Sequence, residues 1–318
     1  MKKIKVLVIG ANGFLGSHLV DSLIHRGYQV RAFDRYKDIK DVNFDLSDEI
    51  EVFSGDFLNQ TDIKTALQDV EYVYHLVSTT TPASADADPL IDIDTNIRGT
   101  VELLQRCVAQ GDIRRVLYSS SGGTVYGDFV SDTPIPEATA TNPVSPYGIG
   151  KVAIENYLSY FNRKYQLDYT IFRIANPYGE RQPLLRKQGV IPIFADLILK
   201  GKPITVYGDG SMVRDYIYVK DVAEIMADAL QNEALKNETV NLGSGMGETI
   251  NQIIAELEKT IGQTAIIEYK EKPSTFVQSV VLDTQKLMEK MKTIHLTPLD
   301  KGISQLVTYM RQAMKQVK

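Results

Sequence analysis

The sequence predicts an α/β protein: a doubly wound parallel sheet with a second, smaller mixed α/β lobe. From Ile4 to Ile174, short β-rich runs alternate with helical patterns, whereas glycines and prolines become frequent after Pro177. The length of 318 residues corresponds to two lobes at about 100–200 residues per domain. Regular alternation of strand and helix requires parallel strands joined by crossovers, with helices covering both faces of the sheet.

The elements of the first lobe follow from local patterns. The apolar run Ile4–Ile9 ends at Gly10 and is typical of a buried parallel strand. Leu15, Leu19 and Leu23 recur every four residues and predict the next helix, which Gly27 ends. Further strands are predicted at Val30–Phe33, Glu51–Phe53, Tyr72–Leu76, Arg115–Ser119 and Tyr169–Ile174, and further helices around Ile63–Leu67, Ile97–Val108 and Tyr147–Tyr165.

The pattern changes at Asn176-Pro177-Tyr178-Gly179, where strands become short and helices unevenly spaced. We therefore predict a first domain at residues 1–176 and a second lobe at residues 177–318. Helical patterns in the second lobe include Val222–Leu230 and Ile250–Ile261. The boundary is soft, because segments of the second lobe can return to the first.

Composition excludes several classes of protein. Lys and Arg number 35 against 40 Asp and Glu, and no Lys/Arg-rich block suggests a nucleic-acid surface or a polybasic membrane patch. A single cysteine, Cys107, permits neither an internal disulfide nor a cysteine zinc site, and we expect no metal. The first apolar run is too short for a signal peptide, and no window approaches about 20 apolar residues. We expect a cytoplasmic enzyme.

A glycine-rich turn predicts a dinucleotide site. Gly10-Ala-Asn-Gly13-Phe-Leu-Gly16 directly follows the first strand and opens the first helix, so phosphates can lie on the helix N-terminus. Asp34 closes the second strand 18 residues after Gly16. A carboxylate there accepts hydrogen bonds from both adenosine ribose hydroxyls and repels a 2′-phosphate, which favours NAD over NADP. Arg35 follows directly and leaves NADP open.

The spacing GxxGxxG resembles the extended short-chain dehydrogenase/reductase family, the NAD-dependent sugar-nucleotide epimerases and dehydratases. Gly55-Asp56-Phe57, His75-Leu76 and Asn96-Ile-Arg-Gly99-Thr100 match further family segments in order and spacing. His75 on its own is interpreted as a packed histidine and Asn96 as a structural hydrogen-bonding residue. The resemblance implies a Rossmann fold and these cofactor-binding residues: Gly10, Asn12, Gly13, Phe14, Leu15, Gly16, Asp34, Arg35, Asp56, Phe57, Leu76, Val77, Asn96, Tyr147 and Lys151.

Tyr147 and Lys151 are the predicted chemical centre. Their i, i+4 spacing places both side chains on one face of a helix, one turn apart. A nearby ammonium stabilises a tyrosine phenolate and lowers its pKa towards the working pH, as acid–base catalysis requires. Alone, the pair also fits an unrelated exposed helix. It stands, however, where the resembling family has its YxxxK motif.

The segment Ser119-Ser-Ser-Gly-Gly-Thr-Val-Tyr-Gly127 departs from the family pattern. Members that eliminate water carry an Asp-Glu pair here and decarboxylating members a Glu, so the absence of a carboxylate argues against dehydratase chemistry. The family's catalytic Ser/Thr position falls on Gly122. If the backbone is extended, alternation favours Thr124 as the replacement hydroxyl. Ser121 is the alternative.

The second lobe resembles the substrate lobe of the epimerases. Arg214 is expected to grip a diphosphate, because a guanidinium forks onto phosphate oxygens; the alternative is a salt bridge with Asp215. The family's later arginine and aspartate are replaced by Lys272 and Thr275. The resemblance implies a nucleotide, UDP as we interpret it, held by Asn176, Gly189, Val190, Thr205, Tyr207, Arg214 and Lys272.

Together these features predict an NAD-dependent 4-epimerase of a UDP-hexose or UDP-N-acetylhexosamine, acting through a transient 4-keto sugar. The alternatives are a nucleotide-sugar reductase or dehydrogenase on the same fold and a non-catalytic NAD-binding protein. Ser279 and Val280 stand where many galactose epimerases carry an aromatic residue, so a 2-acetamido group is expected to fit. Apolar residues on Ile97–Val108 and Ile154–Tyr165 resemble the family's homodimer interface; packing onto the sheet is the alternative.

Overall fold

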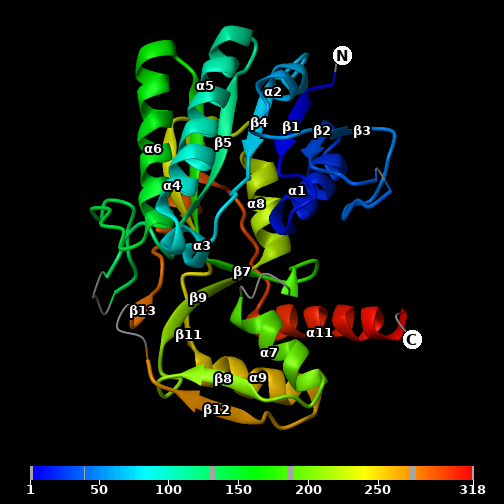
Figure 1. Ribbon diagram of the computed structural model, residues 1–318, viewed down its shortest axis with the longest axis vertical. Helices are drawn as coiled ribbons and strands as arrows, with labels where there is room; N and C mark the ends of the chain where they lie inside the picture. The colour runs from blue at the N-terminus through cyan, green and yellow to red at the C-terminus, as the bar shows by residue number, and fades with distance from the viewer. Residues whose placement is uncertain (1–2, 39, 129–132, 185–188, 273–276, 317–318) are drawn as a thin grey trace.

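Seven parallel strands form the central sheet of the first lobe (Figure 1). The computed structural model describes residues 3–38, 40–128, 133–184, 189–272 and 277–316. The strands are β1 (Lys5–Ile9), β2 (Gln29–Asp34), β3 (Ile50–Ser54), β4 (Tyr72–His75), β5 (Arg115–Ser121), β6 (Asp168–Ile174) and β10 (Glu238–Leu242). Their order in space is β10-β6-β5-β4-β1-β2-β3, which confirms the predicted doubly wound sheet.

Helices cover both faces of this sheet because successive strand residues point to opposite sides. In β1, Val6 and Val8 join the hydrophobic core beneath α1 (Phe14–His25) and α8 (Val219–Ala229). Leu7 and Ile9 join the other core, beneath α2 (Gln60–Ala66), α5 (Arg98–Gln110) and α6 (Pro146–Tyr165). All four side chains have no exposed surface, so the central strand is buried on both faces.

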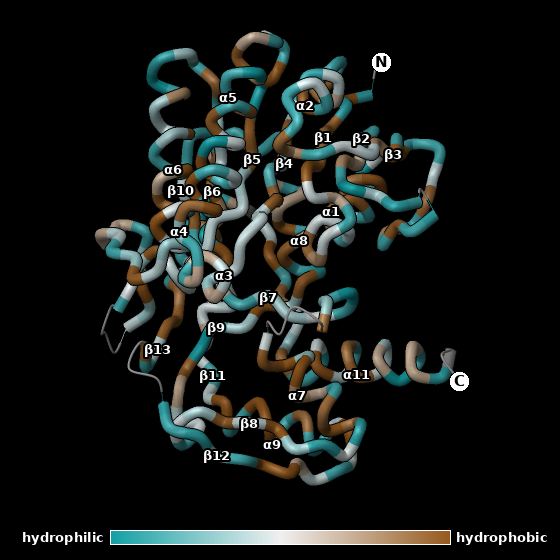
Figure 2. The backbone as a smooth tube through the Cα atoms, in the orientation of Figure 1, coloured by the Kyte–Doolittle hydropathy of each residue, from teal (hydrophilic) through white to brown (hydrophobic). Residues whose placement is uncertain are grey.

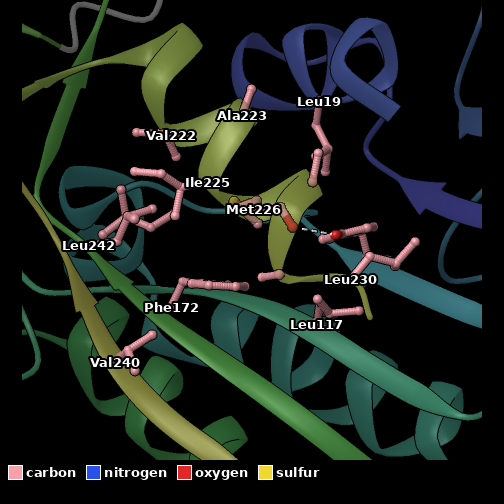
Figure 3. Close-up of a cluster of buried hydrophobic side chains, with 14 of the residues drawn as sticks. Leu19, Leu117, Phe172, Val222, Ala223, Ile225, Met226, Leu230, Val240 and Leu242 are labelled. Atoms are coloured by element: carbon pink, nitrogen blue, oxygen red, sulfur yellow. Dashed lines mark hydrogen bonds between the residues drawn. The ribbon is translucent and has the colours of Figure 1, made fainter. Parts of the chain in front are cut away.

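The chain returns to the first lobe after residue 177. β10 pairs in parallel with β6, and α8 packs against α1. Figure 3 shows α8 presenting Val222 and Met226 to a cluster that includes Leu117 of β5 and Phe172 of β6. The Tyr74 hydroxyl also donates a hydrogen bond to the Met226 carbonyl oxygen, 2.6 Å away. The last sheet strand and one covering helix therefore come from beyond the predicted boundary.

Helix α6 carries the predicted chemical pair and has defined ends. The Ser145 side chain accepts a hydrogen bond from the Gly148 N–H, and Pro146 occupies the first turn, where a missing N–H costs nothing. At the other end, Gln166 adopts the left-handed conformation with φ 58°. The helix predicted over Tyr147–Tyr165 is thus confirmed and fixed in position from its first residue.

In the described residues, the second lobe contains two small sheets and three helices that pack against them. Its strands are β7 (Asn176–Tyr178), β8 (Ile204–Tyr207), β9 (Val213–Tyr218), β11 (Gly247–Thr249), β12 (Ile267–Lys270) and β13 (Ser279–Val280). β11, β9 and β13 form one sheet with β7 paired to β9, and β12 pairs with β8. α7 (Val190–Leu199), α9 (Ile250–Ile261) and α11 (Leu299–Gln316) share a separate core. Figure 2 shows hydrophobic residues along much of α7 and α8.

A short irregular segment leads into α5. α3 (Pro82–Ala87) and α4 (Pro89–Asp92) are followed by a π-helical turn, Ile93–Ile97, and this segment packs against α6. The described residues also form a 3₁₀ turn, Glu233–Leu235, and α10 (Gln285–Lys290). Of the helices in the described ranges, none combines the length and apolar character needed to cross a membrane.

Candidate functional site

The turn after β1 holds the backbone open to a bound group. Gly10 has φ +90°, and a Cβ on Gly16 would lie 2.0 Å from the Gly10 carbonyl oxygen, so only glycine fits at both positions. Gly13 precedes α1 and supplies no side-chain cap to its first turn. The N–H groups at the start of α1 are therefore not capped by that side chain, an arrangement that suits a phosphate.

Asp34 ends β2 beside this turn. Its Oδ2 accepts a hydrogen bond from the Asn12 N–H at 2.9 Å, and its Oδ1 accepts one from the Arg35 N–H at 2.7 Å. Both bonds use backbone donors, which fix the carboxylate at the carboxyl end of the strand. This is the position at which such sheets bind ligands.

A cavity of about 150 Å³ adjoins the glycine turn. It brings together eight of the predicted cofactor residues, which come from four strands and their following loops. These are Gly10, Gly13, Asp34, Arg35, Asp56, Phe57, Leu76 and Val77. The glycine cradle, the uncapped helix and the fixed carboxylate together fit a dinucleotide.

Other predicted cofactor residues have their side chains engaged with the protein. Asn12 accepts a hydrogen bond from the Asn43 N–H at 2.7 Å. Phe14 lies edge-on to His18 with ring centres 6.3 Å apart, and Leu15 packs partly buried against the core below α1. A cofactor role for these three stays a prediction.

Tyr147 and Lys151 lie where α6 meets β5. Both line a small cavity together with Val77 and Ser78, which also line the dinucleotide cavity. The Lys151 ammonium is 5.5 Å from the centre of the Tyr147 ring and donates to the Ser119 carbonyl oxygen at 2.9 Å. The predicted pair therefore faces the predicted cofactor site.

Burial dominates the titration of this pair and corrects one expectation. It raises the pKa of Tyr147 to about 12, with Asp92 acting in the same direction and a hydrogen bond with Ser78 opposing. Burial also lowers the pKa of Lys151 to about 8, against the opposing charges of Asp92 and Glu155. The phenol pKa therefore stands above its usual value and not below it as expected from the sequence, because burial outweighs the influences that lower it.

His75 is a packed residue, as interpreted from the sequence. Its Nε2 is 2.8 Å from the Thr100 hydroxyl, and its ring lies between Phe57 and Tyr118, with ring centres 5.1 and 5.4 Å away. Burial lowers its pKa to about 3, with the Lys151 charge a smaller cause. A neutral, enclosed imidazole supports the sheet below the site.

The segment after β5 turns sharply, so the side chains that follow Ser121 do not alternate between two faces as in an extended strand. The N–H groups of Thr124 and Val125 both donate to the Ser121 carbonyl oxygen, at 3.2 and 3.1 Å. The extended backbone thus ends at Ser121, and strand parity cannot favour Thr124. A Cβ on Gly122 would meet Leu282 at 2.5 Å, which explains glycine there. The Thr124 hydroxyl is buried and has no hydrogen-bond partner among the described residues.

A larger cavity, of about 740 Å³, lies in the second lobe. It brings together six of the seven predicted substrate residues, which come from β7, the start of α7, β8 and β9. These are Asn176, Gly189, Val190, Thr205, Tyr207 and Arg214.

Arg214 reaches this cavity without the predicted alternative partner. Its guanidinium donates to the carbonyl oxygens of Val213 and Val277, at 2.7 and 2.8 Å. Asp215 instead accepts bonds from the Ser244 hydroxyl and N–H. Burial lowers the pKa of Arg214, so its positive charge is only partly solvated and is available to an anion.

Lys272, the seventh predicted substrate residue, is exposed and donates to the Gln278 side chain at 2.8 Å. It is outside the residues that line the cavity. Thr275 lies outside the described residues. Recognition through this segment stays a prediction.

Asp92 is a further residue of this site, which the sequence motifs did not predict. This carboxylate lines the Tyr147–Lys151 cavity, and its Oδ1 accepts a hydrogen bond from the Asn96 side chain at 2.8 Å. Asn96 also accepts the Thr79 N–H at 2.9 Å, in line with its structural interpretation. One signal was present in the sequence: Asp92 interrupts an apolar stretch one helical turn before Asn96.

Comparison with known proteins agrees with this geometry. A model of the NAD dependent epimerase/dehydratase family matches residues 6–243. The UDP-glucose 4-epimerase of Mycolicibacterium smegmatis is 31% identical over 312 residues, covering 96% of this chain and 98% of the relative. A dTDP-4-dehydro-6-deoxyglucose reductase of Escherichia coli is 30% identical over 316 residues, covering 98% of each chain.

Among solved structures, the UDP-glucose 4-epimerase of Thermotoga maritima with UDP-glucose superposes with a TM-score of 0.91. The two chains are 34% identical, and the match covers 98% of this chain and 100% of the other. The likeness therefore extends over both lobes.

Proposed function

The chain belongs to the NAD-dependent epimerase/dehydratase family, and we propose that it interconverts the C4 epimers of a UDP-hexose or UDP-N-acetylhexosamine. The observation that carries the proposal is the placement of Tyr147 and Lys151 in a cavity that shares Val77 and Ser78 with the dinucleotide cavity. Reversible oxidation of a sugar hydroxyl needs an acid–base pair beside the end of the dinucleotide that exchanges hydride.

NAD is the cofactor of this family and, when bound, supplies the hydride acceptor and donor for C4. In this chain the glycine turn and the start of α1 would hold its phosphates, and Asp34 its adenosine ribose. The fixed carboxylate favours NAD over the 2′-phosphorylated cofactor.

Tyr147 is the proposed acid–base residue. Its phenolate would take the proton of the sugar C4 hydroxyl and later return it to the C4 oxygen, when hydride is returned to the opposite face of the 4-keto sugar. Lys151 stabilises the phenolate through its charge, since its ammonium is anchored on Ser119 and not on the phenol oxygen. The base form of a phenol with a pKa near 12 needs such positive charge nearby.

The segment Ser119–Gly127 favours epimerisation over elimination. It places two glycines and Thr124 where dehydratases of the resembling family carry an acidic pair. With no carboxylate there to act as acid and base, the 4-keto sugar is expected to be reduced again rather than dehydrated.

The second-lobe cavity supports a nucleotide diphosphate. Arg214 brings a half-buried positive charge to its wall, and Gly189 and Val190 bring backbone from the start of α7. A guanidinium binds two phosphate oxygens at once, which fixes the orientation of the sugar at the far end.

A reductase is the second candidate, since the Escherichia coli relative carries that name. Incubation of the purified protein with UDP-hexoses separates the two. An epimerase converts each sugar into its C4 epimer, seen by NMR, with no net change of absorbance at 340 nm. A reductase consumes added NADH or NADPH in proportion to product.

We also infer a cytoplasmic homodimer formed through α5 and α6. Tyr157, Tyr160 and Tyr165 on α6 are 39%, 41% and 43% exposed, an unusual amount of aromatic surface for one solvent-facing helix. Light scattering on the purified protein is expected to give twice the mass of 35.6 kDa; Tyr157→Glu is expected to shift it towards the monomer.

A further inference from the structure

Asp92 is a buried carboxylate that the proposed reaction leaves without a role. It ends α4 and is only 3% exposed. Its Oδ1 accepts hydrogen bonds from the Thr80 hydroxyl at 2.5 Å and from the Asn96 side-chain amide at 2.8 Å. Both donors are uncharged, so the negative charge of Asp92 is held in place but not neutralised.

The second oxygen of Asp92 lies against α6 at the chemical pair. A Cβ on Gly150 would stand 2.0 Å from Asp92 Oδ2, so any larger residue there would have to displace the carboxylate. Gly150 immediately precedes Lys151 and comes three residues after Tyr147. The glycine therefore lets a carboxylate approach the helix at the turn that carries both groups.

Lys151 has two carboxylates near it, and one of them is already neutralised. Glu155 forms an ion pair with Arg173 at 2.7 Å and accepts a hydrogen bond from the Ser120 hydroxyl at 2.5 Å. Asp92 forms no ion pair within the described ranges, and its charge opposes the loss of the Lys151 proton more than that of Glu155. Asp92 is thus the available counter-charge for the ammonium.

The other titratable groups around Lys151 carry no charge at neutral pH. His75 from β4 is neutral because burial lowers its pKa to about 3. Tyr118 from β5 lies 4.9 Å from the Lys151 ammonium, and burial raises the pKa of its hydroxyl well above the usual value. Tyr147 on α6 is protonated for the same reason.

We propose that Asp92 is a positioning residue that supplies the negative charge keeping Lys151 protonated beside Tyr147, with Gly150 providing the space for its approach. Whether Lys151 is protonated does not depend on a substrate. The contribution of its charge to catalysis rests on the proposed function. A buried ammonium without a counter-charge loses its proton at a lower pH, because desolvation disfavours the charged form. Removal of the Asp92 charge must therefore narrow the pH range over which Lys151 can stabilise a phenolate.

The first test measures Lys151 directly in the full-length protein. Competitive labelling with acetic anhydride at a series of pH values, read by mass spectrometry of the Lys151 peptide, gives the midpoint of its deprotonation. Asp92→Asn keeps an oxygen to accept from Thr80 and Asn96 and removes only the charge. We expect its midpoint to fall by at least about one pH unit.

Asp94→Asn is the matched control. It makes the same charge change two residues further along, at a side chain that is 59% exposed and paired with Arg98. Its Lys151 midpoint is expected to equal that of the wild type. Equal midpoints in Asp92→Asn and wild type would overturn the proposal, whether or not the protein is an epimerase.

The second test uses Gly150→Ala, which displaces the carboxylate without removing it. The falling alkaline limb of the pH–rate profile is expected to move to lower pH in Gly150→Ala and in Asp92→Asn, and to stay in place in Asp94→Asn. Alkaline limbs that coincide in all four proteins would overturn the proposal even if one variant is poorly folded. If no UDP-sugar is turned over by the wild type, the proposed function fails, and the labelling midpoints alone decide the role of Asp92.

Discussion

The Lys151 ammonium lies 5.5 Å from the centre of the Tyr147 ring and donates its hydrogen bond to the Ser119 carbonyl oxygen. The lysine is therefore anchored on β5 and acts on the phenol through its charge, at a distance fixed by one turn of α6. Burial raises the pKa of Tyr147 to about 12 and lowers that of Lys151 to about 8.

Tyr147→Phe removes the proton carrier and little else. We expect kcat to fall by roughly 10²–10⁴, the usual contribution of a positioned acid–base group, while NAD affinity stays near that of the wild type. Turnover of UDP-sugar and NAD binding by calorimetry measure the two effects. Near wild-type turnover would end the assignment of Tyr147.

Lys151→Met removes the charge that favours the phenolate. Because the pKa of Lys151 is lowered to about 8, wild-type activity is expected to fall as pH rises above about 8 and the ammonium is lost. In Lys151→Met the rate is expected to be depressed and its pH optimum to move upward, since the phenol then needs a higher pH to ionise. Pre-steady-state rates between pH 6 and 10 measure this, and Lys151→Arg, which keeps the charge, is the control.

Gly122 stands where the resembling family has a catalytic serine or threonine, so another residue must supply the hydroxyl. The two candidates are Thr124 and Ser121. After the turn at Ser121 the side chains no longer alternate as in a strand, but the buried Thr124 hydroxyl, which has no hydrogen-bond partner in the described part of the chain, favours Thr124. Thr124→Val is expected to raise the barrier by about 2–4 kcal/mol, as the loss of comparable donors does. Normal kcat in Thr124→Val with a large loss in Ser121→Ala would assign the role to Ser121.

Arg214→Met tests the diphosphate contact. Loss of a charge-assisted contact worth about 1.5–3 kcal/mol predicts a KM for the UDP-sugar roughly 10- to 100-fold higher, with a smaller change in kcat. Lys272→Met is the comparison, because Lys272 is exposed and bonded to Gln278; we expect a smaller effect on KM. Equal effects of the two substitutions would count against Arg214 as the main phosphate ligand.

The sugar's 2-position is predicted to accept an acetamido group. Ser279 and Val280 form β13 and pair with Val213 and Arg214, and neither is aromatic. Relative kcat/KM for UDP-glucose and UDP-N-acetylglucosamine measures this. Activity confined to UDP-glucose and UDP-galactose, even after each of the two residues is replaced by Gly, contradicts the prediction.

Local patterns were sufficient for elements with a clear apolar period. The apolar run Ile4–Ile9 predicts β1, which is buried on both faces, and the helical pattern over Tyr147–Tyr165 predicts α6. The return of β10 to β6 is a contact between segments more than 60 residues apart, which no local period encodes.

The site was predicted where one motif carries several residues, as in the glycine turn and the Tyr147–Lys151 pair. Features of the site that depend on tertiary contacts could not be predicted. The phenol pKa depends on burial, the position of the Thr124 hydroxyl depends on the turn that follows Ser121, and the approach of Asp92 to α6 depends on the space left by Gly150.

In the proposed reaction, hydride leaves C4 and returns to the same carbon without exchange with solvent. This route is tested by incubation of the purified protein with UDP-glucose labelled with deuterium at C4, followed by NMR of the nucleotide sugars. We expect UDP-galactose to form with the deuterium retained at C4 and with no accumulation of absorbance at 340 nm. Epimerisation with loss of the label to water, or stoichiometric formation of NADH without UDP-galactose, would contradict it.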